Sequence, residues 1–295
     1  MLQRAERVLR ANGHHLIFSP TRGPHTAGAI ASESIRDGAD LILVAGGDGT
    51  INEAINGMVH SPVPLGVLPA GTANVLCAEL GLGLDVERAA ANLVQCRPAR
   101  VSLGRICLEN GPRHFLLMAG IGLDAQIVYK VSLPLKAKWG KIAYWIAGFS
   151  LLGRRLTEFG VEIDGQAASC SFALVSKVRN YGGDLEIARD TSLFDNQFEV
   201  VLFSGKSSIR YLKYLAGVAL KRVAGLRGVT VRRACRVKCA PVADRRVYVQ
   251  VDGELTGYTP VTVEIVPDAL TLLVPPAYFR KHAVADGRPA PPVSF

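Results

Sequence analysis

The stretch LILVAGGDGTINEAI, residues 41–55, places an apolar run, a glycine turn and a helical pattern in direct succession. The run at residues 41–45 is continuous, which is typical of a strand covered on both faces. Glycines let backbone N–H groups approach an anion closely, and the N-terminus of the following helix adds partial positive charge. The stretch therefore predicts a phosphate-binding edge in an α/β sheet.

Asp48 is the unusual residue of this turn, because a carboxylate repels phosphate unless a divalent cation lies between them. Mg²⁺ takes hard oxygen ligands and commonly bridges carboxylate and phosphate groups. The other interpretation is that Asp48 only occupies the turn and caps the helix. GGDG matches neither the dinucleotide-binding pattern nor a Walker A loop, and the triplet Gly205–Ser207 lacks the glycine that such a loop needs upstream.

A second turn of the same kind lies in LPAGTANVLCAEL, residues 68–80. It again joins a strand to a helix through glycine, with Thr72 and Asn74 at the start of the helix. Either residue alone is also explained as a helix cap. Two such turns on neighbouring strands of a parallel sheet place two phosphate-binding edges on the same side.

The order of segments predicts two domains and a tail. In residues 1–100, strand-like runs, including residues 15–19 and 64–69, alternate with helical patterns, which predicts a mostly parallel α/β sheet. Residues 101–274 contain short alternating apolar runs separated by turn residues, which predicts an antiparallel β-sandwich. Residues 275–295 are expected to form a C-terminal tail.

Composition limits the partners. The 34 Lys+Arg outnumber the 25 Asp+Glu, and the net charge of +9 favours nucleotide phosphates or an anionic membrane surface. We find no nucleic-acid recognition motif and expect no such partner. The six cysteines lack a CxxC pair, which argues against zinc and fits a reducing cytosol.

The longest lipid-like run, residues 142–152, is too short to span a bilayer. Around it, basic and aromatic residues alternate as in an interfacial helix, and a second basic helical pattern follows at residues 207–225. Ordinary amphipathic helices packed on the sandwich explain both patterns equally well. We expect a cytoplasmic protein that associates peripherally with membranes, and a homodimer is possible on this evidence. The residues concerned are Lys136, Lys138, Trp139, Lys141, Tyr144, Trp145, Arg210, Lys213, Lys221 and Arg222.

Five motifs occur in a fixed order along the chain: GGDGTINE (46–53), LPAGTAN (68–74), AGIGLDA (119–125), NYGGDLEIARDTSLFDNQFEV (180–200) and VDGEL (251–255). Together they resemble the bacterial diacylglycerol kinase catalytic-domain family, which includes soluble lipid kinases related to sphingosine kinases. The resemblance covers nearly the whole chain. It implies a nucleotide-binding α/β domain followed by a β-sandwich domain, with the active site in the cleft between them.

The resemblance also implies site residues and cofactors. ATP and Mg²⁺ would be the cofactors, with Asp48 near the catalytic Mg²⁺. The residues implied to hold ATP are Thr21, Gly46, Gly47, Asp48, Gly49, Thr50, Asn52, Glu53, Gly71, Thr72 and Asn74. Glu254 matches the general base that accepts the proton of the lipid hydroxyl. The residues alone favour a different interpretation of VYVQVDGELTGY, a hairpin with an Asp-Gly turn and an exposed glutamate; the resemblance favours the base.

Asp195 matches an aspartate that binds a second, structural Mg²⁺ together with the backbone carbonyls of Ser192 and Gln197. Here Asn196 and Gln197 stand where the family has glycine and an apolar residue, and a surface turn is the alternative interpretation.

Two further features depart from the family. Its opening strand, with an Asn-Pro…Gly loop, precedes the helix that here begins at Met1, and we expect that the start codon was assigned late rather than that the sheet is incomplete. Val75 replaces an aspartate, so the choice of substrate stays open. The sequence thus predicts an ATP- and Mg²⁺-dependent kinase acting on a diacylglycerol-like hydroxyl. The alternatives are an NAD kinase or a lipid- or nucleotide-binding protein with impaired catalysis.

Overall fold

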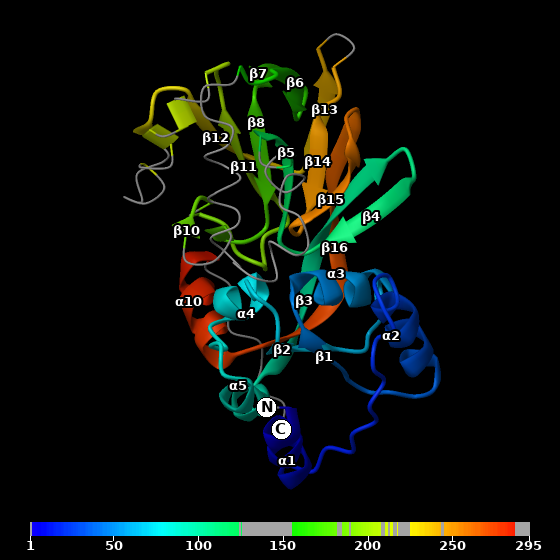
Figure 1. The fold of residues 1–295 in the computed structure, drawn as a ribbon. Coiled ribbons are helices and arrows are strands. Elements are labelled where there is room, and N and C mark those ends of the chain that lie inside the picture. The colour runs from blue at the N-terminus through cyan, green and yellow to red at the C-terminus, as the bar shows by residue number, and fades with distance from the viewer. Residues whose placement is uncertain are drawn as a thin grey trace. The chain divides into compact units, whose positions relative to one another are not determined.

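The structure is a computed structural model in which the chain divides into two compact units. The first comprises Met1–Val101 and Asp268–Phe295, and the second comprises Ser102–Pro267. Each is described by itself (Figure 1). The residues that the structure describes are 2–123, 125, 155–181, 185–188, 190–207, 210–211, 213–214, 217, 225–242 and 245–286.

The first unit is built on the parallel strands β1 (Ile42–Gly46) and β2 (Leu65–Pro69), paired from Ile42↔Leu65 to Gly46↔Pro69. β2 also pairs in parallel with β16 (Val261–Val274). The apolar residues of β2 are buried along its whole length, as expected of a central strand. This arrangement confirms the predicted α/β architecture.

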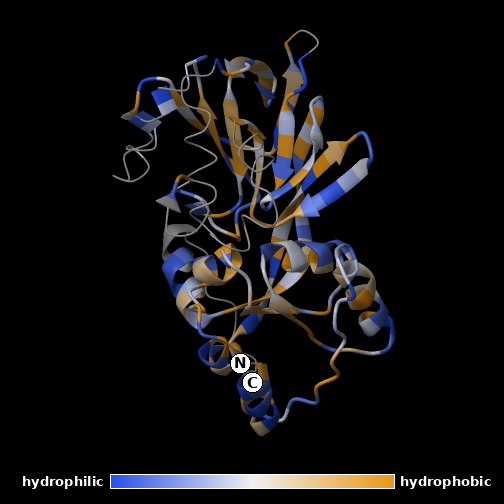
Figure 2. Cartoon of the chain, viewed as in Figure 1, coloured by the Kyte–Doolittle hydropathy of each residue, from blue (hydrophilic) through white to orange (hydrophobic). Residues whose placement is uncertain are grey.

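Short amphipathic helices accompany these strands. Helix α1 packs against α5, and α2 packs against α3. Figure 2 shows hydrophilic and hydrophobic residues mixed along each of these helices, the pattern of helices with one buried face. Tyr278 of the last helix donates a hydrogen bond to Glu79 Oε1 at 3.2 Å, so the segment expected as a tail begins with a packed helix. The helices are α1 (Leu2–Ala11), α2 (Ala27–Arg36), α3 (Asp48–Asn56), α4 (Val75–Leu80), α5 (Val86–Leu93) and α10 (Pro276–Asp286).

The strand predicted at residues 15–19 is not formed, and that prediction is wrong. These residues adopt no helix or strand, and Ile17 and Phe18 are 83% and 62% exposed. A strand needs a hydrogen-bonded neighbour to be stable. Among the described residues β1 pairs with β2 alone, so it is an edge strand. For the same reason β1 is half-buried rather than covered on both faces.

The second unit is the predicted antiparallel β-sandwich. One sheet has the order β16-β13-β6-β7, with β3 pairing to β16 and β4; the other has the order β12-β11-β8-β5-β14-β15. A small ladder joins β9 and β10. The strands are β3 (Arg97–Leu108), β4 (Gly111–Phe115), β5 (Met118–Gly122), β6 (Phe159–Ile163), β7 (Gln166–Cys170), β8 (Phe172–Ser176), β9 (Asn180–Tyr181), β10 (Leu185–Glu186), β11 (Phe198–Phe203), β12 (Val229–Ala234), β13 (Arg236–Pro241), β14 (Tyr248–Val251) and β15 (Glu254–Tyr258).

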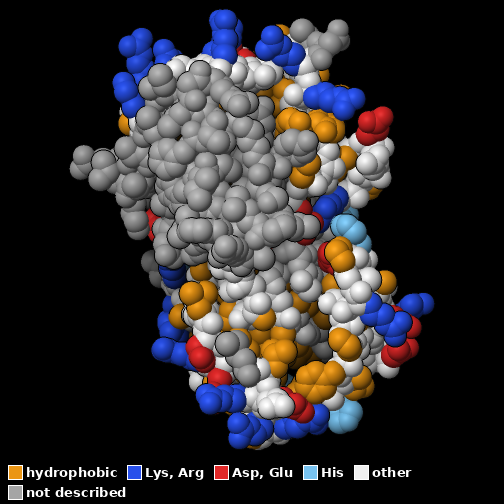
Figure 3. All heavy atoms as spheres, viewed as in Figure 1, with side chains coloured by type: hydrophobic (Ala, Val, Ile, Leu, Met, Phe, Trp, Pro, Cys, Tyr) orange, Lys and Arg blue, Asp and Glu red, His pale blue; other side chains and the backbone are white. Residues whose placement is uncertain are grey.

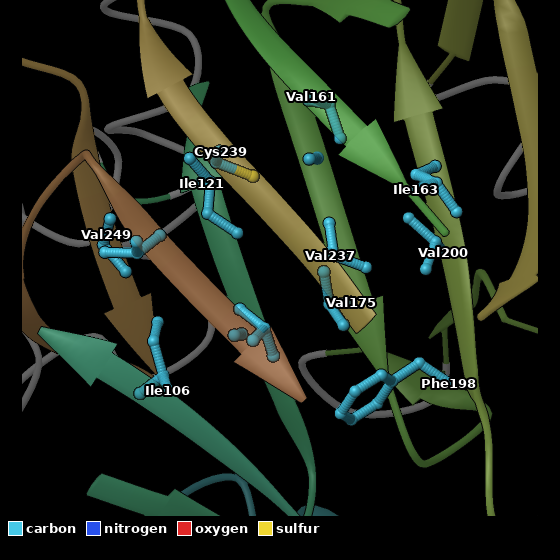
Figure 4. Close-up of a cluster of buried hydrophobic side chains, with 14 of the residues drawn as sticks. Ile106, Ile121, Val161, Ile163, Val175, Phe198, Val200, Val237, Cys239 and Val249 are labelled. Carbon is cyan, nitrogen blue, oxygen red and sulfur yellow. The ribbon is translucent and has the colours of Figure 1, made fainter. Parts of the chain in front are cut away.

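The core of the sandwich is formed by hydrophobic side chains, mostly aliphatic, that point from both sheets toward each other (Figure 4). Alternation along each strand determines which residues take part: on β6, Phe159, Val161 and Ile163 are buried while the residues between them are half-buried. Val175 and Val200 contribute from the facing sheet. Burying each such side chain stabilises the fold by about 1.5–3 kcal/mol.

Most residues of the two segments predicted to bind membranes lie outside the described part of the chain. Residues Lys136, Lys138, Trp139, Lys141, Tyr144, Trp145, Lys221 and Arg222 lie outside the described residues. Arg210 and Lys213 are described and exposed. In the part of the chain that the structure describes, no helix is both long and apolar enough to cross a membrane.

Candidate functional site

The two glycine turns of the first unit touch each other. They follow β1 and β2 at the point where parallel pairing ends, and the Ala70 amide donates to the Gly46 carbonyl at 3.2 Å. A Cβ added to Gly71 would lie 2.3 Å from the Cα of Gly47, a distance that no side-chain carbon tolerates. Glycine at position 71 is therefore a steric requirement, and the contact leaves an edge of backbone without side chains.

Asp48 joins these two turns. It is the first residue of α3, where a carboxylate is stabilised by the helix dipole. Its carboxylate accepts hydrogen bonds from the amides of Val75 at 3.1 Å and Leu76 at 3.2 Å, the first two residues of α4. Asp48 is thus a fixed anion that caps the neighbouring helix.

The charge of Asp48 also acts on Cys77. Burial, and second the negative charge of Asp48, raise the pKa of the Cys77 thiol to about 12. The thiol is therefore protonated at neutral pH and unsuited to act as a nucleophile.

Asn74 shapes the second turn. Its backbone is left-handed, with φ of 48°, a conformation that asparagine adopts more readily than most residues. The side chain closes a small ring, because Oδ1 accepts from the Gly71 amide and Nδ2 donates to the Gly71 carbonyl, both at 2.8 Å. Asn74 itself is buried, whereas Thr72 within the ring is exposed. The turn thus presents the Thr72 hydroxyl while Asn74 holds the backbone.

Glu53 and Asn52 make contacts within the protein. The Glu53 carboxylate accepts from the amides of His25 at 2.8 Å and Ala27 at 3.1 Å, so it caps α2. Asn52 is 1% exposed, and its backbone carbonyl accepts from Asn56 Nδ2 at 2.9 Å. Thr21 is exposed in the irregular segment before this cap. Gly46, Gly47, Gly49 and Thr50 are half-buried around the first turn.

Replacing Glu53 by Ala is expected to lower the free energy of unfolding by about 2 kcal/mol, because two amides at the start of α2 lose a charged acceptor. Denaturant unfolding followed by circular dichroism measures the change. Glu33→Ala, on the exposed surface of α2, is the matched control and should leave the value nearly unchanged. Equal stability of the two variants would contradict the capping role.

In the second unit, Asp252 and Gly253 form the predicted hairpin turn between β14 and β15, both with positive φ, 48° and 84°. The Asp252 carboxylate accepts from the amides of Leu117 at 3.2 Å and Met118 at 2.8 Å. The turn is therefore tied to the start of β5. This bonding fixes the position of Glu254, the first residue of β15.

Glu254 forms an ion pair that the sequence did not predict. Arg113 of β4 donates from Nη2 to Glu254 Oε2 at 2.6 Å. The side chains of Arg113 and Glu254 are 21% and 33% exposed, so the pair is held by the protein yet reachable from solvent. No local signal in the sequence points to Arg113, because the two residues are 141 positions apart.

Asp195 is surrounded by nitrogen donors. Its carboxylate accepts from the Ser192 amide at 3.1 Å and from the Arg233 guanidinium. Its carbonyl accepts from Ser102 Oγ at 2.7 Å and from the amino group of Lys177. Lys177 is fully buried; burial lowers the pKa of its amino group to about 7, with Asp195 opposing and Arg233 adding to the shift.

Gln197, the third residue implied to bind the structural metal, is exposed. Among the described residues, no group of three or more His, Cys, Asp and Glu side chains is arranged to hold a metal ion.

Fold and local geometry define a class of protein: an α/β unit with two phosphate-type glycine turns and a β-sandwich unit. The model of the diacylglycerol kinase catalytic domain matches residues 1–106. The model of the YegS C-terminal NAD kinase beta sandwich-like domain matches residues 118–274. The chain belongs to the diacylglycerol kinase family of lipid kinases.

One curated relative agrees with this assignment, and two solved structures share the fold. The diacylglycerol kinase of Bacillus subtilis (strain 168) is 31% identical over 228 residues, which cover 75% of this chain and 73% of that protein. A crystal structure of a diacylglycerol kinase from Bacillus anthracis str. Sterne superposes with a TM-score of 0.74 at 24% identity, covering 94% of this chain and 91% of the other. An NAD kinase from Archaeoglobus fulgidus in complex with ATP shares the fold more distantly, with a TM-score of 0.53 at 12% identity, over 95% of this chain and 92% of that one.

Proposed function

We propose that this protein is an ATP- and Mg²⁺-dependent kinase that transfers the γ-phosphate to a hydroxyl of a diacylglycerol-like lipid. Family membership supports the reaction class. The observation that carries the proposal is the contact of Gly47 with Gly71, with Asp48 bonded across it to α4. An edge of bare backbone beside a fixed carboxylate suits a nucleotide phosphate paired with a divalent cation.

The ATP phosphates would bind along the two turns. Backbone N–H groups at the start of α3 supply donors, and the Thr72 hydroxyl is exposed beside them. Gly71 has to be glycine because a Cβ there would collide with the Gly47 backbone, so the two turns meet without a side chain between them. Asn74 and Glu53 support this site indirectly, because their hydrogen bonds hold the second turn and the start of α2. Thr21 is assigned here from the family resemblance.

Asp48 would hold the Mg²⁺ ion. Its carboxylate oxygens are hard ligands that two amides hold in place, which fits a hard cation. When bound, Mg²⁺ neutralises the negative charge of the phosphate oxygens and orients them for transfer. The contribution of the chain is to keep Asp48 stationary, so that little reorganisation accompanies the reaction.

Glu254 would act as the general base. It accepts the proton of the lipid hydroxyl while the hydroxyl oxygen forms a bond to the γ-phosphorus and the bond from that phosphorus to ADP breaks. Asp252 fixes the turn that carries Glu254, and Arg113 holds its carboxylate in one orientation. We assign Arg113 as a positioning residue for this base.

The protein would bind its lipid substrate at an anionic membrane surface. The net charge of +9 favours such a surface. Figure 3 shows Lys and Arg side chains gathered at the end of the second unit where Figure 1 labels β6 and β7. Attraction of this kind weakens as salt increases, so we expect binding to anionic vesicles to fall with ionic strength.

An assay with γ-labelled ATP and Mg²⁺ tests the proposal. Mixed micelles present diacylglycerol, phosphatidylglycerol, sphingosine or undecaprenol, and a parallel reaction contains NAD. We expect label in a lipid product, largest with diacylglycerol-like acceptors and absent with NAD. Transfer to NAD alone would favour an NAD kinase, the class to which the Archaeoglobus fulgidus structure belongs. ATP or lipid binding without any transfer would favour a binding protein.

A further inference from the structure

Lys177 places a buried amino group beside Asp195, the residue to which the family resemblance assigns a structural metal ion. It is 0% exposed and follows β8 directly. Its amino group donates to Ser102 Oγ at 2.7 Å and to the carbonyl of Asp195. Ser102 is itself buried and donates to the same carbonyl at 2.7 Å. The segment around Asp195 is thus joined to β3 and to the end of β8 by one buried amino group.

The side-chain carboxylate of Asp195 binds a different set of hydrogen-bond donors. It accepts from the Ser192 amide at 3.1 Å and forms an ion pair with Arg233 of β12. The Asp195 side chain is 11% exposed, whereas that of Arg233 is 48% exposed, so the carboxylate is shielded and the guanidinium reaches solvent. The Asp195 amide in turn donates to the Ser192 carbonyl at 3.0 Å. The oxygens of Asp195 and Ser192 that the family resemblance assigns to a structural Mg²⁺ therefore already bind N–H groups.

A divalent cation does not fit this set of donors. Mg²⁺ demands close to octahedral oxygen coordination and gives up its water reluctantly. The guanidinium of Arg233 is permanently charged and contacts the same carboxylate, so Arg233 and a metal ion would repel each other at a shared ligand. The Lys177 amino group also fills the space next to the Asp195 carbonyl.

We propose that Lys177 and Arg233 replace a structural metal ion at Asp195, so that the second unit is stabilised without a divalent cation at this position. The Lys177 amino group supplies the hydrogen bonds that hold the carbonyl, and Arg233 supplies the charge that balances the carboxylate. The inference concerns the second unit alone and holds whether or not the chain phosphorylates a lipid.

Thermal unfolding of the Asp48→Asn variant, with no nucleotide present, tests the metal independence. Asp48→Asn is the background because a cation at the glycine turns then cannot contribute. We expect the same Tm in excess EDTA and in excess Mg²⁺. A bound metal present at about 100 times its Kd would raise the Tm by several degrees, roughly 5–10 °C for a chain of this size. A rise of that kind would overturn the proposal.

The role of Lys177 is tested by Lys177→Met in the otherwise unaltered chain. We expect a loss of about 5–10 °C in Tm, because the buried Ser102 hydroxyl loses its donor and the Asp195 carbonyl loses one of its two donors. Lys238→Met is the matched control: Lys238 forms an ion pair with Glu162 at 2.7 Å on the surface, and its loss should barely shift the Tm. If both variants unfold like the wild type, Lys177 does not hold this segment and the proposal fails. Failure of Lys177→Met to fold, with Lys238→Met folding normally, supports it.

Discussion

Replacing Glu254 by Gln should lower kcat for lipid phosphorylation by roughly 10²–10⁴-fold, the usual contribution of a general base. Glutamine has nearly the same shape and still accepts a hydrogen bond from Arg113, but it cannot take the proton of the attacking hydroxyl. The KM for ATP should change little, because the residues assigned to ATP belong to the first unit. Initial rates with labelled ATP, over a range of ATP and lipid concentrations, separate the two effects.

Glu264→Gln is the matched control for this variant. Glu264 accepts from Arg105 at 2.7 Å, so the second unit offers another partly exposed Arg–Glu pair of similar geometry. Removing one surface ion pair costs at most about 1 kcal/mol, and the Glu264 variant should keep the wild-type kcat. If Glu254→Gln also kept it, the assignment of the base would be wrong, although the nucleotide site would be untouched.

The second large effect is expected for Asp48→Asn, which should reduce kcat/KM for MgATP by at least ~10²-fold, since a neutral amide is a poor ligand for a hard cation. Stability should fall too, by about 1 kcal/mol, because the side-chain NH₂ would face an amide N–H at the start of α4. Kinetics at varied Mg²⁺ concentrations and denaturant unfolding measure the two consequences independently.

Asp85→Asn provides the comparison. Asp85 also caps a helix, accepting from the Arg88 amide at 2.8 Å, and asparagine is an equally good cap. The kinetics and the free energy of unfolding of the Asp85→Asn variant should both match those of the wild type. An Asp48→Asn variant with wild-type kinetics and lower stability would show that Asp48 is a helix cap and not a metal ligand.

The features that the sequence predicted are those encoded by neighbouring residues. The glycine turns follow apolar strands directly, and the Asp-Gly pair at residues 252 and 253 specifies a hairpin turn by local conformational preference. The division into an α/β unit and a sandwich followed from hydrophobic periodicity. Each of these signals lies within a few positions of the chain.

The features that were missed depend on partners far apart in sequence. Arg113 meets Glu254 across 141 positions, and Lys177 meets Ser102 across 75. A single sequence carries no signal for such pairs, because tertiary packing creates them. The run at residues 15–19 shows the converse: its apolar composition favours a strand, yet strand formation requires a neighbour that the described residues do not provide.

Asn52 and Glu53 show why a motif does not assign individual roles. Both stand within GGDGTINE, but Asn52 is buried and Glu53 caps α2. Glu53 supports the backbone at the start of α2, and the Asn52 carbonyl accepts from Asn56 within α3. Contact with the nucleotide is therefore expected mainly from backbone groups and from exposed Thr72.

The central claim is transfer of the γ-phosphate of ATP to a lipid hydroxyl. The most direct measurement compares ATP labelled at the γ-phosphate with ATP labelled at the α-phosphate, in micelles that contain diacylglycerol and Mg²⁺. We predict that label from γ-labelled ATP accumulates in the organic phase with wild-type protein, that α-labelled ATP gives none, and that Glu254→Gln reduces the signal strongly. Label that stays in the aqueous phase under all these conditions would contradict the assignment as a lipid kinase.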